Sequence, residues 1–320
     1  MSRGPLFDEQ YKPVFSGHET FPLRHGWLKK AYDAVASQAE ANPFLDPAAI
    51  ARFGVGKNMV GSIRHWALFC GIVEETESGK LVPTVIGKLL CGRGGVDPYL
   101  EHKSTLWLLH WLLCSGSLAR PFKTTWYWVF SFCPFSQFRR DEIVEALLRL
   151  AAQRGWQRVS QTTVQRDVEC FVRTYEAKGS QLHGTSEDVL ESPLSELSLL
   201  RGIKGQFSLN RGPKATLSDA VIAYALHDFW NQLGAPKTLS FEAVAHAPGS
   251  PGRVFLLEEG ELVGRLSNLE QLTEGTIRWS ETAGLRQVIF GRHFTETELV
   301  KLLRSDYATG VTSGVLSLCS

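Results

Sequence analysis

The stretch from Ala48 to Gly87 constrains the fold most, because its pattern fits few supersecondary motifs. Its first six residues predict the end of a short helix. Gly54 and Gly56 are expected to form the turn that follows, since glycine tolerates the positive φ of a tight corner. A second helix is then predicted, because apolar side chains recur at helical spacing at Val60, Ile63, Ala67 and Cys70.

A β hairpin is expected directly after this second helix. Residues 72–75 and 81–84 are rich in β-branched and other apolar side chains, and the polar sequence Ser78-Gly79-Lys80 lies between them. A helix, a turn, a second helix and a hairpin are the parts of a winged helix. The stretch therefore predicts a winged helix–turn–helix.

The outward face of the second predicted helix suits a DNA groove. It carries donor-rich or small side chains, and no acidic residue occurs between Asp46 and Glu74. The residues expected on this face are Lys57, Asn58, Gly61, Ser62, Arg64 and His65. A phosphate-binding P-loop is disfavoured, because it needs glycine where Ala51 stands and serine or threonine where Asn58 stands. A winged helix used only for protein contacts remains an alternative.

A second helix–turn–helix is predicted between Asp141 and Tyr175. Asp141 is expected to cap the first helix and Gly155 to end it. Thr162 and Gln165 match a capping box at the start of the second helix. The side chains expected to face DNA from that helix are Thr163, Gln165 and Arg166. A second such motif in the chain strengthens the nucleic-acid interpretation.

The charge distribution points the same way. The chain of 320 residues has a net charge of only +1, yet several long windows contain no acid. Such segregation is typical of a phosphate-binding face with an acidic back, and random clustering of surface charge is the alternative. The window from residue 102 to 140, for example, contains Lys103, Arg120, Lys123, Arg139 and Arg140.

Several other classes of protein are disfavoured. The six cysteines include no C-x-x-C pair, which argues against a zinc site and a disulfide framework. No apolar run follows the N-terminal residues, so no signal peptide is expected. The most apolar stretch, residues 106–114, is too short to span a bilayer. We therefore expect a cytoplasmic protein with no membrane partner.

The segment from Phe15 to Lys30 is the densest in potential chemistry. His18, Glu19 and His25 offer bases and ligands, and we predict them as the catalytic cluster. The alternative is that they only tie a loop through hydrogen bonds. Phosphate contacts are expected from basic residues of this segment and of the C-terminal region, namely Arg24, Lys29, Lys30, Arg253 and Arg286.

The composition changes after a polar linker at residues 179–191. We predict three parts. Residues 1–100 hold the N-terminal motif and the first winged helix, residues 101–178 are helical with the second helix–turn–helix, and residues 192–320 form a mixed α/β domain. The fold class predicted is α+β and mainly α, with winged helix–turn–helix units in the N-terminal two thirds followed by the smaller mixed domain.

Four segments together resemble the SspB family of bacterial DNA phosphorothioation systems. They are FSGHETFPLRHGWLKK at residues 15–30, RFGVGKNMVGSIRHW at 52–66, SPGRVFLL at 250–257 and WSETAGLRQV at 279–288. The resemblance covers nearly the whole chain, and the first two segments are its most specific parts. It implies a nicking endonuclease that opens one DNA strand for phosphorothioate incorporation, in DNA modification and anti-phage defence.

The resemblance also implies partners. These are double-stranded DNA and the cysteine desulfurase, ATPase and ATP pyrophosphatase of the modification system. Mg²⁺ or Mn²⁺ is the cofactor expected for a nickase, and no ligand residue is assigned. The oligomeric state stays open, with a homodimer among the alternatives. A non-catalytic DNA-binding or nick-recognition subunit, or an operon regulator, is the rival interpretation, because no nuclease motif is readable.

Overall fold

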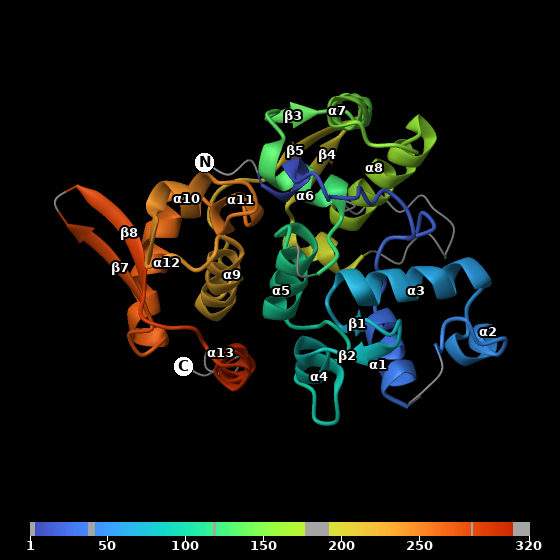
Figure 1. Cartoon of the computed structure of the whole chain (residues 1–320), viewed down its shortest axis with the longest axis horizontal. Coiled ribbons are helices and arrows are strands. Elements are labelled where there is room, and N and C mark those ends of the chain that lie inside the picture. Colours follow the sequence, from blue (N-terminus) through green and yellow to red (C-terminus); the bar gives the residue numbers. More distant parts are fainter. Residues whose placement is uncertain (1–3, 38–41, 118–119, 177–191, 283, 310–320) are drawn as a thin grey trace, which may run out of the picture.

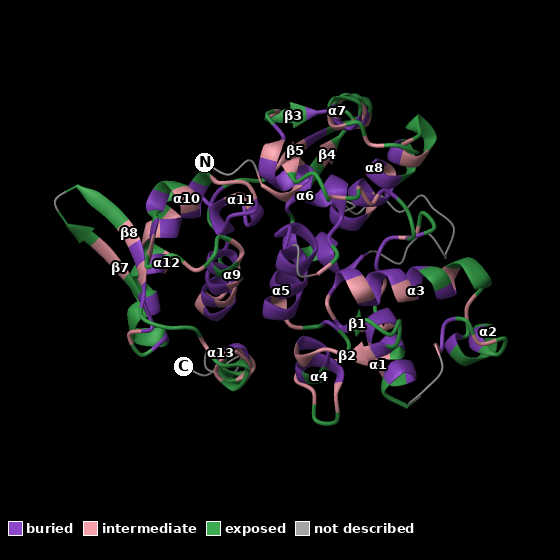
Figure 2. Cartoon of the chain, viewed as in Figure 1, coloured by how far each residue is buried: buried purple, intermediate pink, exposed green. Residues whose placement is uncertain are grey.

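The computed structural model describes residues 4–37, 42–117, 120–176, 192–282 and 284–309. The chain is mainly helical with three small antiparallel sheets, which confirms the α+β, mainly α class. Its elements follow one another as three successive units with buried side chains throughout their interiors (Figures 1 and 2). The predicted linker at residues 179–191 lies outside the described residues. Within the described part, no helix combines the length and the apolar character needed to cross a membrane.

The N-terminal unit contains the stretch predicted as a winged helix. After a 3-10 turn, η1 (Pro5–Phe7), and an extended arm, its elements are α1 (Trp27–Ser37), α2 (Ala49–Phe53), α3 (Lys57–Phe69), β1 (Val73–Glu75), β2 (Leu81–Pro83) and α4 (Val85–Cys91). The helix, turn, helix and hairpin are therefore present as elements. That they act as a DNA-binding winged helix stays a prediction.

One detail of the turn differs from the expectation. Gly54 ends α2 in the left-handed region with φ of 64°, as predicted. Gly56, however, has φ of −65° and an extended conformation just before α3, so the prediction of a positive φ there is wrong. The residue before the first turn of a helix is normally extended, and Gly56 occupies that position.

The buried stripe of α3 is wider than its sequence suggests. Val60, Ile63 and Ala67 are buried as predicted, but Ser62 and His65, expected on the outward face, are buried too. The physical reason is that α3 packs on α1 on one side and is covered on another by the loop at residues 17–21. A helix between two partners buries more than one narrow face.

The middle unit contains a three-stranded sheet. Its elements are α6 (Thr124–Phe132), β3 (Gln137–Phe138), α7 (Arg140–Arg154), α8 (Gln161–Tyr175), η2 (Pro193–Leu197), β4 (Leu200–Ile203) and β5 (Gln206–Leu209). The strands are antiparallel in the order β3-β5-β4, with Phe138 opposite Phe207. This pairing crosses the boundary that the sequence placed before residue 192.

The caps of α7 and α8 differ from the predicted ones. The backbone N–H of Arg139 donates to the Glu142 carboxylate at 2.6 Å, so Arg139 and not Asp141 precedes α7. Ser160 caps α8, with its Oγ accepting from the Thr163 N–H, in place of the predicted Thr162 pair. Gly155 ends α7 with φ of 64°, as predicted.

The C-terminal unit repeats the arrangement of the middle unit. Its elements are α9 (Asp219–Gln232), β6 (Thr238–Ser240), α10 (Phe241–His246), α11 (Pro251–Val254), α12 (Glu259–Leu272), β7 (Ile277–Thr282), β8 (Leu285–Phe290) and α13 (Glu296–Thr309). The strand order β6-β8-β7 is again first, third, second. Both units therefore run helix, strand, helices, hairpin, and the β7–β8 hairpin projects from the body (Figure 1).

Helix α5 (Lys103–Cys114) is buried along its whole length except at its first residue. It packs against α6 and η2 of the middle unit and α9 of the C-terminal unit. His110 of α5 lies 2.8 Å from the Tyr175 hydroxyl of α8 and 2.8 Å from the Val254 carbonyl of α11. The helix thus connects the two repeated units through a buried histidine.

Candidate nucleic-acid interface

We call the loop at residues 17–21 the bridging loop, because it accepts hydrogen bonds from both α3 and α8. From α3, Ser62 Oγ donates to the His18 carbonyl at 2.7 Å and Trp66 Nε1 donates to the Phe21 carbonyl at 3.0 Å. From α8, Arg173 donates to the Thr20 carbonyl at 3.3 Å. Both helices therefore hold the same five-residue loop, and the loop fixes how they lie relative to each other.

A buried polar cluster contacts the inner side of the bridging loop, where His18 lies. His18 Nε2 lies 2.9 Å from Asp167 Oδ1, and Lys123 Nζ lies 2.7 Å from the same oxygen. Thr125 Oγ1 donates to the other carboxylate oxygen. Lys123 and Asp167 are 0% exposed and His18 is 2% exposed. This cluster ties the loop to α8 and to the start of α6.

The hydrogen bonds assign the protonation of His18. Its Nδ1 accepts from the backbone N–H of Thr20 at 2.9 Å, so the ring proton resides on Nε2 and is donated to Asp167. Burial by itself raises the pKa of Asp167, but Lys123 and His18 outweigh burial and hold the pKa below its ordinary value. Both ring nitrogens of His18 are occupied, which is the loop-tying alternative that the sequence left open.

The residues of the bridging loop around His18 face solvent. Gly17, Glu19 and Thr20 have φ of 98°, 48° and 67°, and Glu19 and Thr20 are exposed. Two consecutive non-glycine residues in the left-handed region are strained, and the surrounding hydrogen bonds hold them there. Within the described chain, the Glu19 carboxylate has no hydrogen bond or ion pair. A Cβ at Gly61 of α3 would lie 4.0 Å from Glu19 Cγ, so Glu19 lies beside α3.

The third predicted catalytic residue, His25, lies apart from this cluster. It is exposed, and its Nδ1 donates to the Tyr99 carbonyl at 3.3 Å. Among the described residues, no hydrogen bond or ion pair joins His25 to His18 or Glu19. The structure therefore places the three residues in three environments: one buried, one exposed and unpaired, and one exposed on a neighbouring turn.

The predicted groove residues on α3 and α8 divide into unpaired and paired side chains. Arg64 forms an ion pair with Glu75 of β1 at 2.9 Å, and Thr163 is half-buried beside Ser160. The remaining four are exposed and, in the part of the chain that the structure describes, have no hydrogen-bond or ion-pair partner: Lys57, Asn58, Gln165 and Arg166. Two lie at the start of α3 and two lie in the first turns of α8.

The predicted phosphate contacts near the N-terminus have local partners. Lys29 pairs with Asp33 one helical turn later. Lys30 donates to the Phe53 carbonyl at 2.9 Å. The Arg24 guanidinium lies 5.6 Å from the ring centroids of both Phe21 and Trp27.

The two predicted contacts in the C-terminal unit are also engaged. Arg253 Nε donates to the His246 carbonyl at 3.2 Å. Arg286 lies over the Phe241 ring at 4.1 Å and 3.6 Å from Glu259. Arg286 is exposed on β8, so it remains accessible from solvent.

The roles of Lys123 and Asp167 differ from what the sequence predicts. Lys123 lies in an acid-free window that indicates surface charge, yet it is buried and pairs with Asp167, 44 residues later. No local signal marks such a residue, because its partner comes from another helix. Among the described residues, no group of three or more His, Cys, Asp and Glu side chains could hold a metal ion.

The comparisons with known proteins identify the family. The profile of the family described as "Protein of unknown function (DUF4007)" matches residues 15–307, which is most of the chain. The chain belongs to this family. Two crystal structures of SspB, one of them magnesium ion-bound, superpose with a TM-score of 0.81 and 28% sequence identity. Each match covers 92% of this chain and 88% of the SspB chain, which confirms the resemblance to SspB. No curated protein matches the chain.

Proposed function

We propose that this protein is the SspB component of a bacterial DNA phosphorothioation system and that it binds duplex DNA and nicks one strand. One observation carries the proposal: Glu19, an exposed carboxylate with no hydrogen-bond or ion-pair partner among the described residues, lies beside α3 on the loop that α3 and α8 both hold, and the first turns of these helices present polar side chains that likewise lack a described partner. The similarity to SspB over 92% of the chain supports the same assignment.

DNA binding is assigned to α3 and α8 as recognition helices of winged-helix units. Helix N-terminal turns attract phosphate through their free N–H groups, and the side chains there can reach base edges. Lys57 and Arg166 supply the cations, while Asn58 and Gln165 supply amides that can pair with adenine. The bridging loop sets the angle between the helices, so both can contact one duplex only in the geometry that it fixes.

Strand cleavage is assigned to the surface around Glu19. Hydrolysis of a phosphodiester needs an activated water, stabilisation of the developing charge and a proton for the leaving oxygen. Mg²⁺ is commonly held by one or two carboxylates together with substrate phosphates, and the single free carboxylate of Glu19 fits that type of site. The ion, when bound, would stabilise the charge of the transition state. His18 anchors the bridging loop through its two hydrogen bonds. His25, six residues after Glu19 in the sequence, is an exposed histidine that could act as a base.

A non-catalytic DNA-binding or nick-recognition subunit is the second candidate. The occupied ring nitrogens of His18 favour it, because a general base needs a free nitrogen. In either case we expect the cysteine desulfurase, ATPase and ATP pyrophosphatase of the system as partners.

Relaxation of supercoiled plasmid tests the proposal. Purified protein with Mg²⁺ or Mn²⁺ is expected to produce open circles, and protein with a chelator is not. Glu19→Gln is expected to remove nicking while duplex binding persists. Glu270→Gln, an exposed carboxylate on α12, is the matched control and should nick normally.

Two results would separate the candidates. Nicking that survives Glu19→Gln would contradict the assignment of the chemistry to the bridging loop. Duplex binding without nicking under any metal condition would overturn the nickase and favour the non-catalytic subunit.

A further inference from the structure

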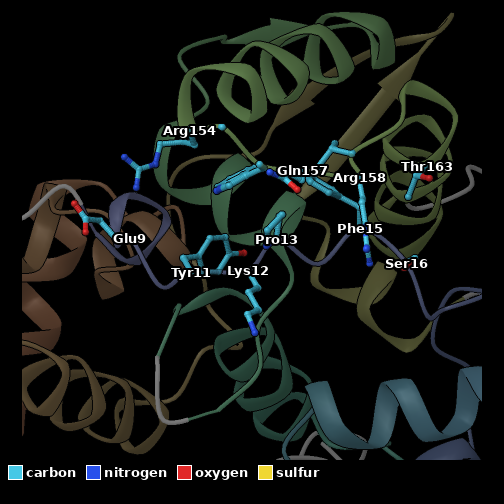
Figure 3. Close-up of a pocket in the computed structure, with 13 residues that line it drawn as sticks. Glu9, Tyr11, Lys12, Pro13, Phe15, Ser16, Arg154, Gln157, Arg158 and Thr163 are labelled. Carbon is cyan, nitrogen blue, oxygen red and sulfur yellow. The ribbon is translucent and has the colours of Figure 1, made fainter.

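A hollow of about 520 Å³ lies between the N-terminal arm and the connection from α7 to α8 (Figure 3). Arm residues 9–16 form one side, and residues 154–159 form the other, together with Thr163 of α8. The volume falls within the range of sites for small ligands. None of the predicted catalytic residues lines it, and Thr163 is the one predicted DNA contact that does.

The walls of the hollow are held in place by hydrogen bonds. Arg154 donates to the carbonyls of Phe7 and Asp8 at 2.9 and 3.1 Å, which attaches the arm to the end of α7. Further along, the Val14 N–H donates to Thr124 Oγ1 at 2.7 Å. The arm is thus fixed at both ends of the segment that lines the hollow, and the site is pre-formed.

The lining combines aromatic rings with free cations. Tyr11 and Trp156 lie with ring centroids 5.5 Å apart, and both are half-buried. Lys12 and Arg158 are exposed and form no hydrogen bond or ion pair with any described residue. Glu9 is the one acid in the lining. Aromatic faces beside unpaired cations are the features that hold an unstacked base and its phosphate.

We propose that this hollow binds one unpaired nucleotide of DNA, with its base against Trp156 and its phosphate at Lys12 and Arg158. The proposal rests on the proposed function, because such a nucleotide would flank the cleaved bond. Ser16 lines the hollow and lies three residues before Glu19, so their Cα atoms are at most about 10 Å apart. A nucleotide held there leaves the neighbouring phosphate close to the Glu19 carboxylate.

Fluorescence anisotropy with two labelled DNA probes tests this. One probe is an intact duplex, and the other is the same duplex with a short single-stranded gap, both in the presence of chelator. The variants are Lys12→Gln/Arg158→Gln, whose residues are exposed, and Trp156→Leu. Their controls are Lys301→Gln/Arg304→Gln on α13 and Tyr99→Leu, an exposed tyrosine that does not line the hollow.

The hollow variants are expected to weaken binding of the gapped duplex about tenfold, since stacking and phosphate contacts to one nucleotide are lost. Binding of the intact duplex should change by less than about threefold, and the controls should leave both unchanged. Equal weakening for both probes would overturn the proposal, because the hollow would then contact ordinary duplex. Unchanged binding of the gapped duplex would overturn it as well.

A titration with thymidine monophosphate separates this proposal from the proposed function. If the wild-type chain binds neither DNA probe, the proposed function fails. Saturable quenching of tryptophan fluorescence by the nucleotide, lost in Trp156→Leu, would then still place a nucleotide in the hollow. Absence of quenching together with absence of DNA binding would overturn both.

Discussion

Replacing Asp167 by asparagine tests how much the buried cluster of His18, Lys123 and Asp167 contributes to the free energy of unfolding. Asp167 pairs with Lys123 at 2.7 Å, and both side chains are 0% exposed. The substitution keeps the size of the side chain and leaves the Lys123 ammonium buried without its anion. Removing one partner of a buried pair costs about 3–5 kcal/mol, because the remaining charge stays uncompensated. We expect the free energy of unfolding to fall by that amount at pH 7.

Urea unfolding, followed by tryptophan fluorescence, measures the loss. With an m-value of about 2–3 kcal/mol/M, the unfolding midpoint should fall by roughly 1–2.5 M. Glu145→Gln is the matched control, since Glu145 is 68% exposed in its ion pair with Arg149, and it should leave the midpoint unchanged. The double variant Asp167→Asn/Lys123→Met should recover part of the loss, because it removes the uncompensated charge.

The pH dependence has a defined sign. The folded pKa of Asp167 lies below its unfolded value of about 3.9, so its contribution is fully present above that value and is lost as pH falls below it. The difference between wild type and Asp167→Asn should therefore be largest near neutral pH and shrink below about pH 4. A midpoint unchanged by Asp167→Asn at pH 7, or a double variant less stable than the single one, would refute the reasoning.

Three further outcomes are expected. Lys57→Ala/Arg166→Ala should weaken duplex binding and flatten its salt dependence by roughly two phosphate contacts, and unchanged affinity in a filter-binding titration would contradict it. Glu75→Gln should strengthen duplex binding by releasing Arg64, more than the exposed neighbour variant Glu74→Gln; equal gains would show a general charge effect. Burial lowers the pKa of His110 to about 4, so the folded wild type should lose about 2 kcal/mol of stability between pH 6.5 and pH 4.5, and His110→Gln should not show this loss. Urea unfolding of both proteins at the two pH values measures the difference. An equal change in the free energy of unfolding for both proteins would refute the prediction.

Local patterns predicted the elements well where the sequence itself sets their limits. The periodic apolar residues of α3 and the left-handed Gly54 and Gly155 all follow from neighbours a few residues away. The caps of α7 and α8 were misplaced by two residues, because several polar residues near each start can accept the same N–H groups.

The candidate site could be predicted only in part. The segment from Phe15 to Lys30 was singled out, and His18 and Glu19 do lie on the loop that joins α3 to α8. The sequence could not show that His18 is buried and Glu19 exposed, because His18 binds Asp167, which lies 149 residues later in the chain. The pairing of Arg64 with Glu75 was missed for a related reason: the hairpin folds back and brings an acid to a helix that the sequence shows as free of acids.

The sequence by itself predicted the helix, turn, helix and hairpin of the N-terminal unit, the ends of α2 and α7 at Gly54 and Gly155, and the likeness to SspB, because periodicity, glycine conformation and family motifs are properties of short segments. The tertiary structure decided which charges are free. Whether Lys123, Arg64 or Lys57 is buried, paired or exposed depends on helices and strands that meet only after the chain has folded. Electrostatic interactions act through space and not along the chain, so the charged groups that stay without a partner among the described residues became visible only in the structure.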